Sequence, residues 1–290
     1  MSSTGIQEYL DVPYGSVSSE DVYHQFDIFT PQARDKGSPS PLICFVHGGA
    51  WRSEDKSYHR SLARRLVMST HYPVAVPNYR LTPSTPTEDD HLYHPAHAED
   101  ILQFLHFIQT WRGPESTPIY DASRLYLLGH SCGAHILTSI FLDSSGVTAS
   151  LTPSPTLSDA VRGIGLSEGI YDLNRLLQSY PGYREWFIES AFGKRDDFSP
   201  FSTTALPLRD GSLHMKWLVL HSKGDTLVDE VQASLMYEHL TSLYQARDLP
   251  VDVHVAKNWD ELHEEHNDLL RGDKYVELIS KFVMGPASAA

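Results

Sequence analysis

A serine between two glycines is the feature of this sequence that most directly suggests chemistry. Residues 129–133 read GHSCG, directly after an apolar run and directly before a helical pattern. This spacing fits G-x-S-x-G, the sharp strand-to-helix turn that exposes a serine hydroxyl. Glycines are needed two positions before and two positions after the serine, because side chains there would collide with adjacent segments of the backbone. The sequence therefore predicts that Ser131 is a nucleophile.

The same five residues permit two other interpretations. In the first, Cys132 is the nucleophile, but it stands one residue past the apex of the turn, where its side chain should point away from a base. In the second, the segment is a tight structural turn without chemistry. His130 is interpreted as a neighbour of the serine and not as its base.

A serine hydroxyl needs a general base, and the base needs an acid that orients it. Where this turn occurs, the chain order is serine, acid, histidine. Asp225 follows an apolar strand-like run and is preferred to Asp229, which resembles a helix N-cap. His266 is preferred to His263 because it directly precedes a helix-like run. The predicted triad is therefore Ser131, Asp225 and His266.

A second glycine motif supplies a candidate oxyanion hole. Residues 45–51 read FVHGGAW and leave another apolar run. Adjacent glycines let backbone N–H groups approach a developing oxyanion without an intervening Cβ. The predicted donors are the amides of Gly48, Gly49 and Ala50, together with the amide of Cys132.

Further side chains are candidates for contact with a substrate. Three aromatic residues are candidates for its pocket wall, although the core is the favoured interpretation for each: Trp51, Trp186 and Phe187. Glu168 ends a predicted strand and could either touch the active site or form a structural ion pair.

The histidine clusters do not predict a metal site. Residues 263–266 read HEEH, which has neither the H-E-x-x-H nor the H-x-x-E-H spacing. His91, His94 and His97 are spread around Pro95, and their alternative interpretation is a solvated loop leading into a helix. We expect no metal and no other cofactor.

The elements that must position these residues alternate between strands and helices. This pattern predicts an α/β fold with a mostly parallel sheet and helices on both faces. An antiparallel edge strand is expected at residues 23–31. The main strands are predicted at residues 42–47, 74–79, 124–129, 161–167, 216–222 and 251–256. The helices are predicted at residues 57–68, 96–111, 132–142, 229–245 and 266–283.

A length of 290 residues suits one large domain, so we expect residues 1–290 to form a single unit. Residues 172–213 interrupt the alternation with tyrosine, tryptophan and phenylalanine but no strand periodicity. They are predicted to form a small helical cap over the carboxyl edge of the sheet, where open α/β sheets bind ligands. The alternative is an ordinary long connection with a buried aromatic patch.

Composition narrows the class of partner. A net charge of −14 argues against nucleic-acid and anionic membrane surfaces, which would repel the protein. Cys44 and Cys132 lie in apolar segments, which favours a reducing compartment over a disulfide framework. The first residues lack a leader pattern, and no apolar run approaches 18 residues. We expect a soluble cytoplasmic protein with a small-molecule substrate, and a homodimer stays open.

Together these motifs resemble the α/β-hydrolase superfamily, in the branch that carries an HGG oxyanion motif. HGGAW, PNYRLTP, HPAHAED and GHSCG follow the order and spacing of that branch. SKGD and HEEHND then supply the acid and the histidine. Esterases similar to hormone-sensitive lipase usually show HGGG and GDSAG, whereas this chain has Ala50 and His130 at the differing positions.

The combination of HGGxW, GHSxG, GIYDL and HND is more similar to kynurenine formamidases (arylformamidases), particularly the fungal ones. Cys132 stands where that family would have alanine. The resemblance implies a Ser-His-Asp hydrolase that converts N-formyl-L-kynurenine to L-kynurenine and formate through a formyl-enzyme, in tryptophan catabolism toward NAD. Two other functions stay open: a carboxylesterase acting on short acyl esters, and a non-catalytic binding protein on a hydrolase fold.

Overall fold

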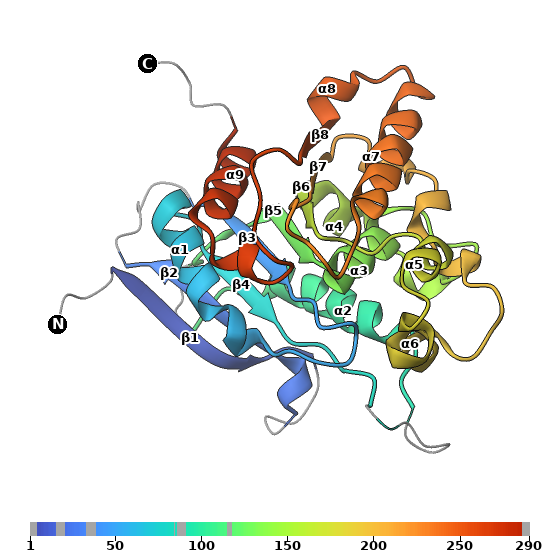
Figure 1. Ribbon diagram of the computed structural model, residues 1–290. Coiled ribbons are helices and arrows are strands. Elements are labelled where there is room, and N and C mark those ends of the chain that lie inside the picture. Colours follow the sequence, from blue (N-terminus) through green and yellow to red (C-terminus); the bar gives the residue numbers. More distant parts are fainter. Residues whose placement is uncertain are drawn as a thin grey trace.

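The computed structural model describes residues 5–15, 21–32, 39–83, 85, 91–114 and 118–285. Its strands form one sheet in the order β1-β2-β4-β3-β5-β6-β7-β8 (Figure 1). Strands β3 to β8 pair in parallel, and β2 is antiparallel to both of its neighbours. The strands are β1 (Ile6–Pro13), β2 (Gln25–Pro31), β3 (Pro41–Val46), β4 (Val74–Pro77), β5 (Asp121–His130), β6 (Val161–Ser167), β7 (Lys216–Leu220) and β8 (Val255–Asn258).

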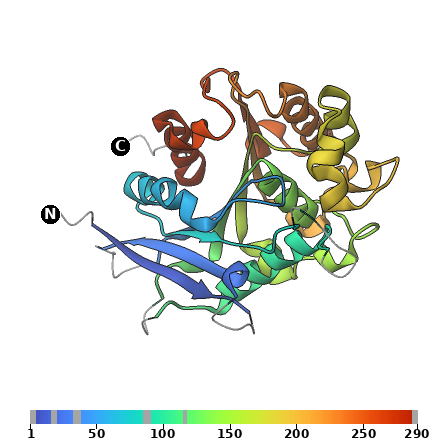
Figure 2. The ribbon, with the colours of Figure 1, turned by 60° about the horizontal axis from the view of Figure 1, so that its bottom comes forward.

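Helices cover both faces of this sheet. Helices α1 and α9 lie together on one face, and α2 and α3 lie on the other (Figures 1 and 2). The helices are α1 (Arg60–Thr70), α2 (Ala96–Thr110), α3 (Cys132–Phe141), α4 (Pro155–Ala160), α5 (Leu173–Ser179), α6 (Glu189–Phe192), α7 (Glu230–Gln245), α8 (Val251–His254) and α9 (Asp273–Met284).

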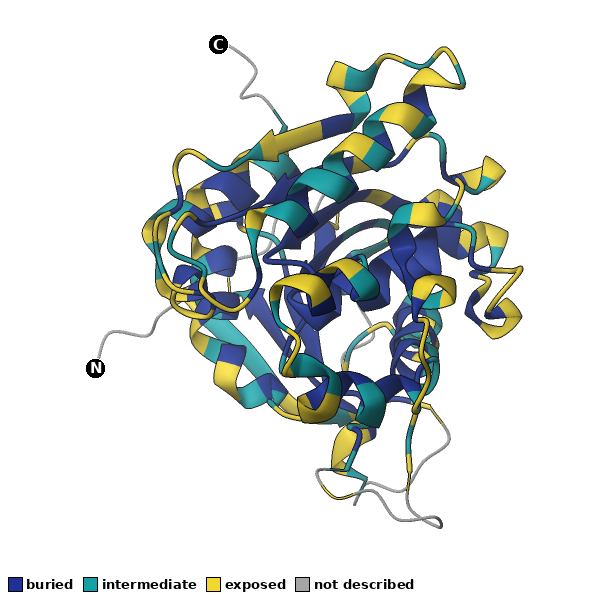
Figure 3. Ribbon diagram, turned by 45° about the vertical axis from the view of Figure 1, so that its right-hand side comes forward, coloured by how far each residue is buried: buried dark blue, intermediate teal, exposed yellow. Residues whose placement is uncertain are grey.

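The side chains of β3 show why the sheet needs two covering layers. Successive strand residues point to opposite faces. Leu42, Cys44 and Val46 belong to the core that includes α2 and α3. Ile43 and Phe45 belong to the separate core that includes α1 and α9. Strands β3 and β4 are buried along their whole length, and the last four residues of β5 are buried too, which is typical of a parallel sheet covered on both sides (Figure 3).

The parallel pairing brings distant segments to one edge of the sheet. Strands β5, β6 and β7 are neighbours and run in the same direction. Their carboxyl ends therefore lie side by side, followed by Ser131, Glu168 and the loop that holds Asp225. This edge is where open α/β sheets bind ligands.

The predicted fold class is confirmed, but three element predictions are wrong. The strand predicted at residues 23–31 is β2, and it is antiparallel as expected. It is not the edge strand, because β1 pairs with its outer side. Residues 251–254 form α8, and the strand begins only at Val255, because Pro250 favours a helix start. Helix α9 begins at Asp273 instead of residue 266, with Gly272 as its N-cap.

Residues 172–213, all of which the structure describes, contain α5, a π-helical turn (Arg184–Ile188), α6 and short 3₁₀ turns, but no strand. This segment lies at the right of Figure 1. Across the described part of the chain, none of the helices has the length and apolar character needed to span a membrane.

Candidate active site

Ser131 occupies a strained turn between β5 and α3. Its φ of 54° and ψ of −121° are unusual for a residue other than glycine. A Cβ on Gly129 would lie 2.7 Å from the Gly133 carbonyl oxygen, and a Cβ on Gly133 would lie 2.3 Å from the Val46 oxygen. Both positions therefore require glycine. The Ser131 amide donates to the Ser167 carbonyl of β6 at 2.9 Å, which fixes the turn to the sheet.

Asp225 and His266 form a hydrogen-bonded pair near this turn. His266 Nδ1 lies 2.7 Å from Asp225 Oδ2, and Asp225 Oδ1 accepts the amides of Leu227 at 2.8 Å and Val228 at 3.0 Å. Burial alone would raise the pKa of Asp225, but its hydrogen bonds and the charge of His266 hold that pKa well below its usual range. An ionised carboxylate on Nδ1 leaves the Nε2 atom of His266 available as a base.

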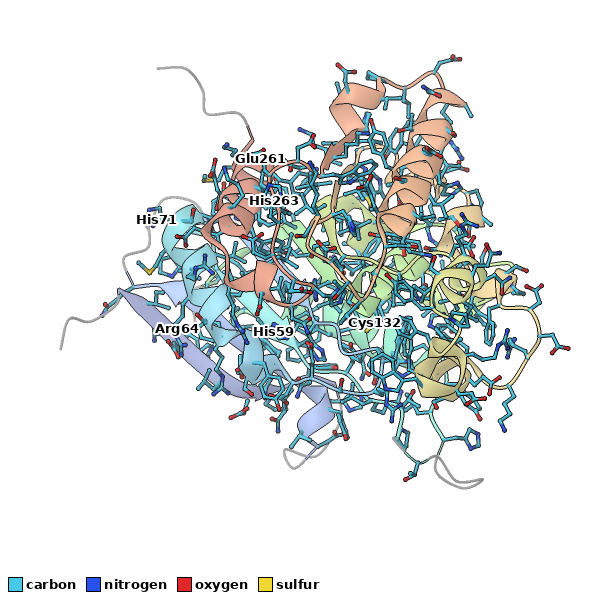
Figure 4. The ribbon with its side chains drawn as sticks, viewed as in Figure 1. His59, Arg64, His71, Cys132, Glu261 and His263 are labelled. Carbon is cyan, nitrogen blue, oxygen red and sulfur yellow. The ribbon has the colours of Figure 1, made fainter. Side chains whose placement is uncertain are left out.

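The structure separates the competing residues from this pair. His263 is exposed, and Figure 4 shows it on the loop before α9, to one side of Cys132. His130 is buried, and this burial with the neighbouring His266 lowers the pKa of His130 to about 3. Asp229 is the N-cap residue of α7 and accepts the Ser179 hydroxyl at 2.5 Å. Among these residues, only Asp225 bonds to His266.

The glycine loop after β3 lies against the serine. A Cβ on Gly48 would come within 3.0 Å of the Ser131 Cβ. Gly49 and Ala50 line the same cavity as Ser131, with φ angles of 92° and 52°. The Tyr79 hydroxyl donates to the Gly48 carbonyl at 2.9 Å and thereby fixes the loop. The predicted oxyanion loop is thus adjacent to the predicted nucleophile.

Cys132 holds this loop through its sulfur. The Trp51 amide donates to Cys132 Sγ at 3.2 Å. The thiol is fully buried, and burial raises its pKa to about 12. A buried, protonated thiol is a poor nucleophile, which argues against the cysteine interpretation.

Ser131 and His266 open into one cavity of about 370 Å³. The side chains that line it fall into two groups by chemistry, which we name the apolar wall and the polar wall. The apolar wall comprises Ile170, Tyr183, Trp186, Phe187, Leu227 and Val228. The polar wall comprises Arg52, Ser53, Glu54 and Asn267.

The three aromatic candidates for substrate contact separate in the structure. Trp186 lines the cavity with 52% of its surface exposed, and Phe187 lines it from a buried position. Trp51 does not line the cavity, because it is fully buried and packs edge-on against Phe192 and His135. Its size and apolar character fit the core better than an exposed wall.

The chain is similar in sequence to known hydrolases. Residues 26–151 match the family model described as BD-FAE. The kynurenine formamidase of Meyerozyma guilliermondii is 28% identical over 252 residues, which cover 85% of this chain and 85% of that protein. The kynurenine formamidase of Eremothecium gossypii is 28% identical over 269 residues, which cover 88% of this chain and 98% of that protein.

The fold is shared with a solved esterase. Esterase B from Lactobacillus rhamnosis matches with a TM-score of 0.72 over 97% of this chain and 84% of that chain, at 15% identity. The chain therefore has the α/β-hydrolase fold, and its sequence is similar to those of hydrolases. The predicted resemblance to fungal kynurenine formamidases is confirmed at the level of sequence.

Glu168 lies beside the pair of Asp225 and His266. It is fully buried, and its Oε1 atom accepts the Ser222 amide at 2.8 Å. His221 Nδ1 is 2.9 Å from Oε2 but out of line for a hydrogen bond. Burial, followed by the hydrogen bond and charge of Asp225, raises the pKa of Glu168 well above its usual value. Glu168 is therefore a neutral acid next to an ionised one.

A neutral Glu168 predicts how the stability of the protein depends on pH. Above the ordinary glutamate pKa of 4.5, the unfolded chain releases the Glu168 proton while the folded chain keeps it, so the group costs stability as pH rises. Gln cannot ionise, and its amide can make the same hydrogen bonds. The Tm of Glu168→Gln relative to wild type should therefore increase from pH 5 to pH 8 in thermal melts. Exposed Glu185→Gln is the control, and an equal, flat response of both variants would contradict a neutral Glu168.

Two groups of side chains in the described residues are close enough to hold a metal ion: Glu168, Asp225 and His266, and separately His47, Glu54 and His59. In the first group, Asp225 already binds His266 Nδ1. In the second, His59 Nε2 contacts Glu54 Oε2 at 2.9 Å. The rings of His47 and His59 lie nearly parallel, with an interplanar angle of 9°. The chemistry of both groups fits hydrogen bonding better than metal binding.

The polar wall is what the sequence interpretation missed. Arg52 and Glu54 follow the HGGAW motif within four residues, and Asn267 follows His266 directly. Charged residues so close to an oxyanion motif were a usable signal. No feature of the sequence indicated that these side chains point into the cavity, because loop residues carry no periodicity that orients their side chains.

Proposed function

We propose that this α/β-hydrolase hydrolyses N-formyl-L-kynurenine to L-kynurenine and formate. The observation that carries the proposal is the cavity, in which a serine and a histidine face an aromatic wall. An aryl formamide has a one-carbon acyl group and a large aromatic leaving group, so it needs such an asymmetric site. The names of two relatives that cover most of the chain support the same substrate.

Ser131 acts as the nucleophile in this proposal. Its hydroxyl oxygen attacks the formyl carbon while His266 Nε2 takes the hydroxyl proton. Asp225 stabilises the imidazolium through the 2.7 Å contact to Nδ1. The tetrahedral oxyanion is bound by backbone amides of the glycine loop and of Cys132, and each such donor is worth roughly 10²–10³ in rate.

His266 then acts as a general acid. It protonates the aniline nitrogen, the C–N bond breaks, and L-kynurenine leaves against the wall that contains Tyr183, Trp186 and Phe187. The formyl group stays on the Ser131 oxygen. Water, deprotonated by His266, attacks this ester and releases formate, which restores the serine hydroxyl.

A carboxylesterase acting on short acyl esters is the second candidate. The aliphatic part of the cavity wall supports it, since Ile170, Leu227 and Val228 would accept an alkyl group. The two charged residues of the polar wall favour the formamide as substrate. Its amino-acid end carries charges that can pair with them, whereas a neutral alkyl ester carries none.

Steady-state kinetics distinguish the two functions. We expect kcat/KM for N-formyl-L-kynurenine to exceed the values for p-nitrophenyl acetate and p-nitrophenyl butyrate. The reason is that only the kynurenine substrate matches both walls of the cavity. Faster ester hydrolysis with negligible formate release would favour the esterase and reject the formamidase.

The proposal includes a cap, a location and a partner class. Residues 172–213 act as a cap within one domain, supported by the aromatic residues that they place on the cavity wall. A cytoplasmic location is supported by two free, buried cysteines.

The binding partner in this proposal is a small molecule. The negative net charge supports this, because nucleic acids and anionic membranes would repel the protein. A homodimer stays open within this proposal.

A further inference from the structure

Glu54 is an unexpected residue at its position. It lines the active-site cavity with a φ of 75°, a backbone conformation that favours glycine. Holding a residue other than glycine there strains the backbone, and such strain concentrates at functional sites. The loop therefore carries a carboxylate at a position where glycine would adopt the backbone conformation with less strain.

The surroundings hold Glu54 in one orientation and one charge state. His59 Nε2 lies 2.9 Å from Glu54 Oε2, and His59 in turn packs against Phe45 with ring centroids 5.0 Å apart. Figure 4 shows His59 near the start of α1. Burial would raise the pKa of Glu54, but the hydrogen bond and charge of His59 outweigh it and lower that pKa to about 2. The group is a fixed carboxylate at neutral pH.

This charge lies close to the reacting serine. Glu54 and Ser131 line the same cavity, and the charge of Glu54 acts on His130 and Cys132, the two sequence neighbours of Ser131. A negative charge here opposes an oxyanion that develops at Ser131. A positive charge on the substrate, added to that of His59, would offset this cost.

The remaining charged group of the polar wall is a guanidinium. Arg52 lines the cavity and donates through Nη1 to the carbonyl of Trp186, a residue of the apolar wall. A guanidinium carries five N–H donors in a planar fork that suits carboxylates. The described wall thus presents one anion and one cation on the same loop, which complements a zwitterion.

We propose that Glu54 binds the α-ammonium group of the substrate's amino-acid end, with Arg52 facing the α-carboxylate. This inference rests on the proposed formamidase function and specifies how the site selects an amino acid over other aryl formamides. Glu54 and Arg52 take no part in bond breaking. They position the aryl formamide so that its formyl carbon faces Ser131.

The test compares substrates that differ only in the ammonium group. N-formyl-L-kynurenine and its des-amino analogue, in which hydrogen replaces the α-amino group, are assayed with wild type, Glu54→Gln and Glu54→Asp. Gln can still bond to His59, so a melting curve should show a folded protein. Asp keeps the charge. Glu185→Gln is the matched control, because it removes one charge from an exposed residue outside the cavity wall.

We expect Glu54→Gln to lower the kcat/KM ratio of amine to des-amino substrate by about 10- to 100-fold, mainly through KM, as a charge-assisted hydrogen bond predicts. Glu54→Asp should retain part of the ratio, and Glu185→Gln should retain all of it. Equal losses for both substrates would show a merely structural role and overturn the inference. So would an unchanged ratio.

A second readout separates this inference from the proposed function. L-kynurenine and its des-amino analogue are tested as inhibitors of p-nitrophenyl acetate hydrolysis. If wild type hydrolyses no formamide, the formamidase function fails, yet a preference for the amine that Glu54→Gln abolishes still supports the ammonium site. If wild type shows no preference for the amine, the ammonium site is refuted whichever substrate is hydrolysed.

Discussion

Ser131→Ala should lower kcat for both N-formyl-L-kynurenine and p-nitrophenyl acetate by about 10⁴-fold or more, as expected when a triad nucleophile is removed. The hydroxyl is the only group of Ser131 that is lost, and the strained backbone of the turn is unchanged. Tm should therefore shift by no more than about 3 °C. Steady-state kinetics and a thermal melt measure the two effects.

The matched control is Ser139→Ala, which removes a hydroxyl from α3, the helix that follows Ser131. Ser139 Oγ lies 3.4 Å from His135 Nδ1, away from the cavity. This variant should keep its activity within about 3-fold, since a substitution outside the site changes little. Full activity in Ser131→Ala would reject the serine-hydrolase mechanism. An inactive wild type would instead favour a non-catalytic binding protein.

His266→Ala should lower kcat by about 10⁴-fold or more, because the loss of the base disables the triad as a unit. The reason lies in placement: His266 is buried, bonded to Asp225 at 2.7 Å and opens into the cavity with Ser131. The measurement is kcat for the formamide and for p-nitrophenyl acetate, with circular dichroism to check the fold.

His263→Ala provides the control from the same loop. His263 is exposed and contacts Glu264 only through its backbone amide, so kcat should stay within about 2-fold of wild type. The acid offers a parallel pair, in which Asp225→Asn should cost about 10⁴-fold and Asp229→Asn far less. A larger loss of kcat in His263→Ala than in His266→Ala would show that His263, and not His266, is the base.

Local patterns were sufficient for the central strands and for the turn at Ser131. The apolar run before Gly129 and the helical pattern after Cys132 fix a strand, a sharp turn and a helix, which is what the structure contains. The prediction failed where local patterns are ambiguous. Residues 251–256 alternate like a strand, but the first four form a helical turn after Pro250. The helix predicted from His266 begins at Asp273, because residues 268–271 form a separate 3₁₀ turn that ends at Gly272.

The sequence by itself determined the fold class, the strained turn and the order of serine, acid and histidine, because these depend on periodicity and glycine spacing within short segments. Only the tertiary structure decided which histidine meets Asp225, that Trp51 belongs to the core, and that Glu54 lines the cavity. The physical reason is that parallel strands bring residues about a hundred positions apart to one edge of the sheet. The direction of a loop side chain there depends on packing between segments, which local sequence does not encode.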